Sequence, residues 1–281
     1  MTAYQLSNLK PQHVDEIRAL LDAGPRWSNL LIRAAARNFT EFQGWWQGAF
    51  GDGELRAIAC VSSHHFANIY GTPLDAVSAL GDSMVRAAAG RASQGGTHRL
   101  FGEEAIIDTY WERFKTINRT KVDDRIRNLV RTETSGEVKK AYEVRRATEA
   151  DAPLVAEFAA EQQVEQGGVD PRRGNREGWD AMCRQNIADG RTLVGFQRGK
   201  PAFSADLSID EGTAMLDRLY VPRPLRRPKV VAGMLGAACQ LALGDADEVL
   251  AFVDADKEPW PEATEAAGMG TMCKYRMIVL R

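Results

Sequence analysis

The residues with the clearest chemical potential form a short basic cluster in the second half of the chain. Four cations fall within seven residues, between a strand-like run at 214–221 and an almost wholly apolar segment at 230–243. These cations are Arg223, Arg226, Arg227 and Lys229. A strand that passes through a loop into a buried helix presents backbone amides and the positive end of the helix dipole to that loop. The pattern predicts a phosphate or pyrophosphate site, and a solvated basic turn is the alternative.

Carboxylates in the same half could take a proton from an attacking amine. Asp217 lies on the strand that precedes the basic cluster. Glu161 and Glu165 flank the end of a helix expected from residue 149 to about 161. Asp217 and Glu165 are the preferred general-base candidates, although each acid has a solvated surface position as its alternative.

Composition excludes several other classes of protein. The 281 residues carry 36 basic and 38 acidic side chains, and 44% are apolar, which is typical of a globular protein. The nearly balanced charge argues against DNA as a partner. Four widely spaced cysteines form no C-x-x-C pair, so we expect no metal site. The apolar run at 230–243 is too short for a membrane span, and we expect a cytoplasmic location with no membrane partner.

The chain divides into two similar halves around a polar stretch. Residues 118–141 are read as a linker that contains a short strand at 126–130. The predicted lobes are 1–117 and 142–281, and each begins with a strand and a helix and continues into a hairpin. This weak internal repeat predicts two copies of one α+β unit.

The second lobe shows the fuller pattern of elements. Thr148 is the expected N-cap of its first helix, with Asp151 as the capping-box partner. The remaining expected elements are a hairpin at 192–207, a strand at 214–221, a helix at 230–243, a strand at 249–253, a helical turn at 262–267 and a strand at 275–280.

Over residues 142–281 this order resembles the GNAT family of CoA-dependent N-acyltransferases. The family signature is a strand with Val-x-Pro, followed by Arg/Gln-x-x-Gly-x-Gly/Ala at the start of a helix. Its first part is matched by Tyr220-Val221-Pro222-Arg223-Pro224-Leu225-Arg226. The resemblance implies two tandem GNAT-like lobes, each with a twisted mixed β-sheet flanked by helices. It also implies transfer of an acetyl group from acetyl-CoA to the amine of a small molecule.

The resemblance also assigns residues to the donor. Leu219 and Val221 would border the donor on the strand, and the pyrophosphate would lie at the start of the helix. The residues implied for the pyrophosphate and for the following strand are Arg226, Arg227, Lys229, Val230 and Lys257.

Several positions depart from the family pattern. Arg227 and Lys229 stand where glycines would let the backbone approach a phosphate. Lys257 occupies the position of an asparagine, and Thr264 that of the tyrosine that commonly protonates the departing thiolate. Tyr220 remains nearby as the candidate acid.

Two alternatives to a CoA-dependent acyltransferase therefore stay open. One is a catalytically inactive protein that binds a ligand or a partner. The other is an acyltransferase that takes its acyl group from aminoacyl-tRNA or from a carrier-protein thioester, with the basic cluster contacting RNA phosphates or an acidic carrier. A monomer and a homodimer are equally compatible with the sequence.

Overall fold

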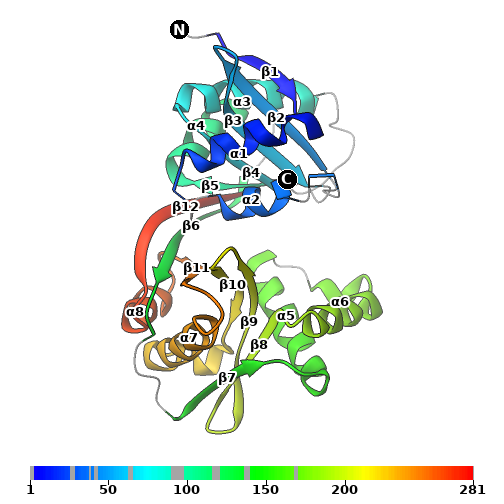
Figure 1. Ribbon diagram of the computed structural model, residues 1–281. Coiled ribbons are helices and arrows are strands. Elements are labelled where there is room, and N and C mark those ends of the chain that lie inside the picture. The colour runs from blue at the N-terminus through cyan, green and yellow to red at the C-terminus, as the bar shows by residue number, and fades with distance from the viewer. Residues whose placement is uncertain are drawn as a thin grey trace. The chain divides into compact units, whose positions relative to one another are not determined.

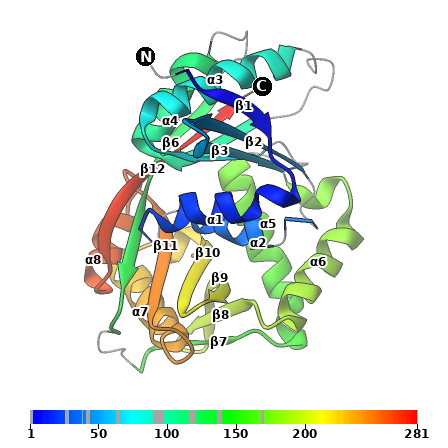
Figure 2. The same cartoon turned by 45° about the horizontal axis from the view of Figure 1, so that its top comes forward.

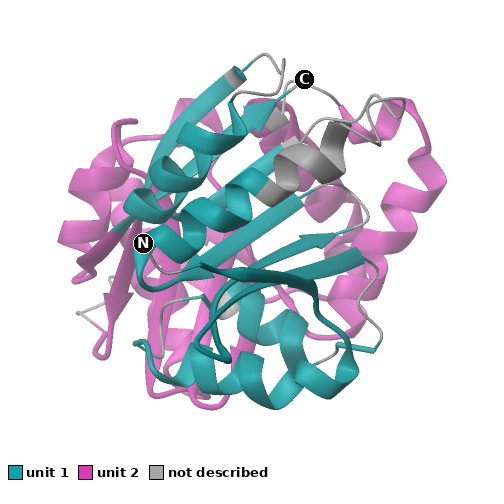
Figure 3. Cartoon of the chain, turned by 90° about the horizontal axis from the view of Figure 1, so that it is seen from above, with its two compact units in different colours: residues 1–127, 274–281 teal, residues 128–273 magenta. Residues whose placement is uncertain are grey.

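The computed structural model divides into two compact units, residues 1–127 with 274–281 and residues 128–273 (Figure 3). Each unit is considered by itself. The structure describes residues 3–25, 29–37, 39–40, 44–62, 66–89, 98–115, 121–135, 140–167 and 170–280.

The first unit is built from short strands and paired helices. Its elements are β1 (Gln5–Asn8), η1 (Pro11–His13), α1 (Val14–Asp22), α2 (Leu30–Arg37), β2 (Gly44–Gly51), β3 (Glu54–Ser62), β4 (Phe66–Gly71), α3 (Leu74–Ala89), β5 (His98–Glu103) and α4 (Glu104–Phe114). The strand order in this unit is β1-β2-β3-β4-β5-β12-β6, in which β6 (Lys121–Thr132) and β12 (Gly270–Leu280) come from later in the chain.

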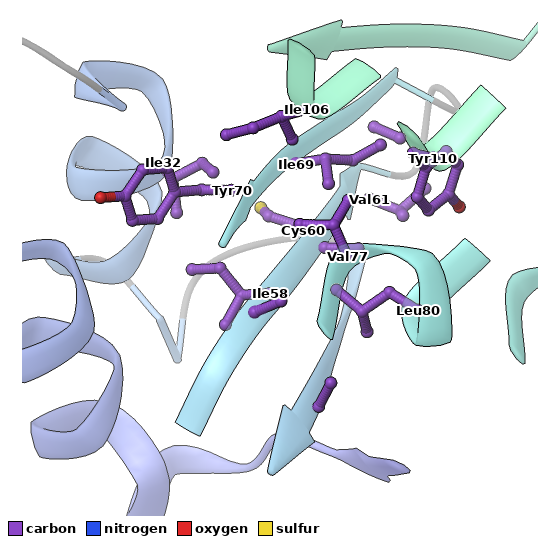
Figure 4. Packing of buried hydrophobic residues seen from close by; sticks show 14 of the residues in the cluster. Ile32, Ile58, Cys60, Val61, Ile69, Tyr70, Val77, Leu80, Ile106 and Tyr110 are labelled. Atoms are coloured by element: carbon purple, nitrogen blue, oxygen red, sulfur yellow. The ribbon is translucent and has the colours of Figure 1, made fainter. Parts of the chain in front are cut away.

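Helices cover both faces of the first sheet, with α1 and α2 on one side and α3 and α4 on the other (Figure 2). The central strand β3 is consequently buried on both faces. Ile58 and Cys60 lie on the side of Ile32 from α2, and Val61 lies beside Val77 of α3 (Figure 4).

The second unit repeats the same sequence of elements. These are β7 (Tyr142–Arg146), η2 (Glu149–Asp151), α5 (Ala152–Gly167), η3 (Pro171–Arg173), α6 (Arg176–Ala188), β8 (Thr192–Gln197), β9 (Lys200–Asp210), β10 (Thr213–Tyr220), η4 (Arg223–Leu225), α7 (Pro228–Ala242), β11 (Glu248–Asp254) and α8 (Trp260–Ala266). The strand order is β6-β11-β10-β9-β8-β7.

The second sheet also lies between two layers of helices, with α7 and α8 on one face and α5 and α6 on the other (Figure 1). Side chains of β8 alternate between the layers. Leu193 packs in the core beneath α7, and Val194 packs in the core beneath α5 and α6. The nearly all-apolar α7 is buried along most of its length, as its sequence predicts.

Local signals in the second lobe are confirmed. The backbone amide and the hydroxyl of Thr148 both donate to Asp151 Oδ2, at 2.7 and 2.9 Å, so the capping box forms with aspartate in place of glutamate. The β8–β9 hairpin turns through Arg198 and Gly199, whose φ angles of 52° and 75° belong to a two-residue turn with both residues left-handed.

The segment expected as a linker is in large part a strand. The predicted short strand at 126–130 lies inside the longer β6, whose first residues belong to the first unit and whose last five belong to the second. The two compact units divide between residues 127 and 128 and between 273 and 274, whereas the sequence prediction places the lobes at 1–117 and 142–281. The ends of the expected linker, 118–120 and 136–139, lie outside the described residues.

Ion pairs account for the polar composition of β6. Arg276 of β12 binds Asp124 with two hydrogen bonds, from Nε at 2.9 Å and Nη2 at 2.6 Å, and it also contacts Asp108. Arg131 pairs with the largely buried Glu248 of β11. The charged residues of β6 are therefore paired with charged residues of β12 and β11, and their charge does not indicate a loop.

We expect Asp124→Asn to reduce the stability of the protein at neutral pH by about 1 kcal/mol. The hydrogen bond from Arg276 lowers the pKa of Asp124 to about 2, from 3.8. A depressed pKa contributes stability above the unfolded-state value and loses it as pH falls. Urea unfolding should show the full difference at pH 7 and a shrinking one between pH 4 and pH 2. A difference independent of pH would contradict this assignment.

Candidate active site

The strand β10 carries a β-bulge near its end. Its pairing with β9 runs regularly from Thr213 to Asp217 and resumes one register step later at Tyr220. Arg218 takes up the extra residue with a left-handed φ of 48°. As a result Leu216 and Leu219, three residues apart, face the same core, and Tyr220 turns toward α5. The bulge therefore directs the Tyr220 side chain to its position.

The pairing of β10 with its parallel neighbour β11 ends just before the bulge. Their pairing extends from Thr213 opposite Glu248 to Leu216 opposite Ala251, whereas the strands continue to Tyr220 and Asp254. The corresponding strand of the first unit, β4, pairs with β3 without a register shift. Of the two corresponding strands, β4 and β10, the bulge is therefore found in β10 of the second unit.

A pocket of about 410 Å³ lies beside the end of β10. Its walls come from α5, from the 3-10 helix η3 that precedes α6, and from the loop after β10. The lining residues are Glu161, Val164, Glu165, Arg172, Tyr220, Pro222, Arg223 and Pro224. This volume falls in the range of small-molecule sites. The pocket thus combines apolar walls with a few charged groups.

Tyr220 and Glu161 form a hydrogen-bonded pair in this pocket. The Tyr220 hydroxyl donates to Glu161 Oε2, and the tyrosine ring packs against Phe158 with centroids 5.2 Å apart. Burial, and then the bond to Glu161, raise the pKa of the Tyr220 hydroxyl above its ordinary value. The hydroxyl is therefore protonated at neutral pH and acts as a donor. Glu161 forms no ion pair within the described part of the chain.

Glu165, one helical turn further along α5, is held by two arginines. Its Oε1 accepts from Arg223 Nε at 3.0 Å and its Oε2 from Arg226 Nη2 at 2.6 Å. Both carboxylate oxygens of Glu165 are therefore already engaged by guanidinium groups. The predicted general base Glu165 is thus part of an ion-pair cluster, and Glu161 is the carboxylate better placed for that role.

Arg226 points inward and away from the start of α7. Its Nε donates to the Val221 carbonyl at 2.7 Å, and its guanidinium lies 5.4 Å from the centre of the Tyr220 ring. Only 21% of the side chain is exposed. Arg226 thus holds Tyr220 and Glu165 in position, and its contact with a pyrophosphate stays a prediction.

The loop after β10 uses most of its backbone amides internally. Pro222, Pro224 and Pro228 have no amide hydrogen. Five other amides donate to carbonyls of the loop itself, namely those of Leu225, Arg226, Arg227, Val230 and Val231, at 2.7–3.2 Å. Two of the predicted cations, Arg227 and Lys229, are exposed on this loop. Any phosphate contact here would come from these side chains more than from a cradle of amides.

The remaining predicted residues divide between exposed and core positions. Asp217 is exposed, its Oδ1 accepts from the Arg218 amide at 2.7 Å, and it does not line the pocket. Lys257 pairs with Asp254 at 3.4 Å on β11. Val221, after β10, and Val230, on α7, are both buried in the core between α7 and the sheet, and Leu219 packs at the edge of that core.

Thr264, at the position of the family tyrosine, is almost fully buried. Its hydroxyl donates to the carbonyls of Trp260 and Pro261 within α8. This site therefore offers no acid toward the pocket, and Tyr220 is the tyrosine that the fold brings there.

Sequence reasoning missed the contribution of η3. Arg172 enters the pocket wall because Asp170 caps this short helix and binds the arginine through Nε and Nη2, each at 2.9 Å. The Asp-Pro-Arg sequence at 170–172 is a helix-start signal that could have indicated the turn. No sequence pattern indicates that it faces the end of β10.

Within the described residues, no helix is long and apolar enough to cross a membrane. The same part of the chain contains no group of three or more histidine, cysteine, aspartate or glutamate side chains placed to hold a metal ion.

Comparison with solved structures identifies the fold. The chain is similar over 98% of its length to a GCN5-related N-acetyltransferase from Sphaerobacter thermophilus, with a TM-score of 0.68, 16% identity and 95% of that chain covered. A GNAT-family acetyltransferase from Colwellia psychrerythraea gives a TM-score of 0.61 at 12% identity, with 98% of each chain covered. A tandem GNAT protein from the clavulanic acid biosynthesis pathway gives 0.58 at 12% identity, with 99% and 98% covered.

No protein-family model matches the sequence, and no curated protein matches it. At these identities the structural likeness shows the fold. The predicted α+β architecture of two tandem GNAT-like lobes is therefore confirmed.

Proposed function

We propose that the protein is an N-acyltransferase whose acceptor amine binds in the pocket beside Tyr220. The observation that carries this proposal is the Glu161–Tyr220 pair, held where β10 bulges and separates from β11. The acetyltransferases of the same fold support the reaction class. The comparisons support the reaction class alone, and we propose the acceptor amine and the acyl donor from the pocket and its surroundings.

Glu161 would receive the amine. A carboxylate without an ion-pair partner in a partly apolar pocket attracts an ammonium group and then takes its proton. The neutral amine attacks the carbonyl carbon of the acyl thioester, the new C–N bond forms, and the C–S bond breaks. Glu161 releases the first proton to solvent, takes the second nitrogen proton as the new bond forms, and returns it through their hydrogen bond to Tyr220, which replaces the proton given to the departing sulfur.

Tyr220 would orient Glu161 and supply a proton to the leaving sulfur. Its hydroxyl is protonated at neutral pH, because burial and the bond to Glu161 raise its pKa. Phe158 and Arg226 fix the ring from two sides. Positioning of the two reactants would account for much of the rate.

Acetyl-CoA is the donor we propose. The separated ends of β10 and β11 fit the extended arm of the donor, because strand ends that do not pair with each other leave backbone groups for it. The loop fits the pyrophosphate less well, since so many of its amides are bonded internally. Arg227 and Lys229 would make the phosphate contacts.

The same loop favours a carrier-protein thioester as the second candidate donor. An exposed basic loop suits the acidic face of a carrier, and a carrier needs no amide cradle for a pyrophosphate.

Calorimetry with acetyl-CoA tests the donor. We expect the double variant Arg227→Gln/Lys229→Gln to weaken binding by about tenfold at low salt, and by less as salt screens the charges. Arg226→Ala should instead lower stability by about 1–3 kcal/mol, because it leaves Glu165 and the Val221 carbonyl with fewer partners. No binding of acetyl-CoA by the parent protein would retire this donor and move carrier thioesters forward.

A further inference from the structure

The charges of the pocket point to a particular class of acceptor. We propose that the pocket binds a zwitterionic amine, specifically an α-amino acid with an apolar side chain, and that its amino group is the one acylated. This inference rests on the proposed acyltransferase function and adds the recognition of a carboxylate beside the amine.

Once the ion pairs of the pocket are counted, one negative and one positive charge remain uncompensated. Arg172 is neutralised mainly by Asp170 through two hydrogen bonds, while the charges of Glu157 and Glu161 act on it from farther away. Glu165 lies between Arg223 and Arg226, so one carboxylate faces two guanidinium groups and one positive charge remains. Glu161, whose hydrogen bond comes from the neutral Tyr220 hydroxyl, supplies the negative charge. A ligand that carries both charges would match this arrangement.

Arg223 is the group able to bind the carboxylate. It uses Nε toward Glu165, while its two Nη atoms make no hydrogen bond to the residues that the structure describes. The side chain lines the pocket and is 77% exposed. A guanidinium group binds a carboxylate with two parallel hydrogen bonds, and the two Nη atoms of Arg223 provide that fork.

The spacing of the two charges suits a small zwitterion. Glu161 and Glu165 are four residues apart on α5, which places their β-carbons roughly 6 Å from each other on one face. A ligand whose ammonium binds Glu161 and whose carboxylate reaches Arg223 beside Glu165 must carry the two groups a few bonds apart. An α-amino acid meets this condition.

The apolar wall indicates the side chain. Val164, Pro222 and Pro224 line the pocket between the charged groups. Val164 is 39% exposed, a high value for a large apolar residue. An apolar amino-acid side chain would cover this wall and bury it from water.

Matched acceptors test the inference. Leucine and phenylalanine should be acetylated with a kcat/KM about tenfold above that of their decarboxylated amines, 3-methylbutylamine and phenethylamine, because each amine lacks the charge-assisted hydrogen bonds. Arg223→Gln should bring this ratio close to one. Arg173→Gln, which removes an exposed neighbouring charge outside the pocket lining, should leave the ratio as in the parent.

Binding of the amino acids by calorimetry, without donor, separates this inference from the proposed function. Equal acetylation of amino acids and amines by the parent would overturn the zwitterion inference and leave the acyltransferase standing. Amino-acid binding that Arg223→Gln abolishes, without acetylation of any acceptor, would support the pocket assignment and contradict the acyltransferase. If the parent protein neither binds nor acetylates the amino acids, the inference is overturned.

Discussion

We expect Glu161→Gln to lower the kcat of the proposed acyl transfer by about 10²–10⁴-fold, the range that a positioned general base contributes. Glutamine keeps the size of the side chain and can still accept the Tyr220 hydrogen bond, but it cannot take the proton of the amine. The pocket and the tyrosine should therefore remain in place. Steady-state release of the free thiol of CoA, with a primary amine as acceptor, measures the effect.

Glu157→Gln is the matched control, since Glu157 is an exposed carboxylate one turn earlier on the same helix. It should change kcat by less than about twofold, in line with a surface position. Comparable losses in the two variants would contradict the role of Glu161, because they would show a general effect of charge on α5. Unfolding curves of the parent and both variants should coincide.

Phe203→Ala is the substitution that we expect to destabilise the second unit most. Phe203 is fully buried on β9 among the residues packed beneath α7. It also fills the space opposite Gly195, where an added β-carbon would lie 2.9 Å from its own. Truncation of a buried phenylalanine costs about 3–5 kcal/mol, because it removes buried apolar surface and leaves a cavity. Urea unfolding followed by fluorescence or circular dichroism measures this loss.

Phe196→Ala on the neighbouring strand β8 provides the comparison. Phe196 is partly buried against the other core, and its ring lies 5.0 Å from the Arg145 guanidinium. Its truncation should cost roughly half as much or less, since part of the ring is already in water. A larger loss for Phe196 than for Phe203 would show that the core beneath α7 is not the main source of stability.

The sequence predicts the elements of the second lobe well because their signals are local. The Thr148–Asp151 capping box, the glycine turn at 199 and the apolar run of α7 each depend on neighbours within a few residues. Where a signal was short-range, the structure differs from the prediction by only a few residues at the ends of the elements. The helix expected to end near 161 continues through 167, since no glycine or proline interrupts it earlier.

Long-range pairing explains what the sequence could not predict. Arg226 matches a family position for phosphate contact, yet its guanidinium binds Glu165, 61 residues earlier. The strand β6 is too polar to stand out as a strand, because its charges are paired with Arg276 and Glu248 from far along the chain. Periodicity and motif spacing carry no information about such partners.

The bulge in β10 had no clear sequence signal either. Asp217 and Arg218 are ordinary strand-surface residues, and the left-handed φ of Arg218 is one that glycine or asparagine more often adopts. Arg218 pairs with Asp206 of β9 at 2.5 Å, so a tertiary contact accompanies the bulge. The candidate pocket depends on this feature, because it turns Tyr220 toward Glu161.

We propose that the Glu161–Tyr220 pocket of the second unit carries acyl transfer to an amine. Mass spectrometry of reactions containing acetyl-CoA and a panel of primary amines and amino acids tests it most directly. We predict an N-acetylated product with the parent protein and with Glu157→Gln, and at most a trace with Glu161→Gln. Acetylated product formed equally by Glu161→Gln, or none from any acceptor with a parent protein that binds acetyl-CoA, would contradict the claim.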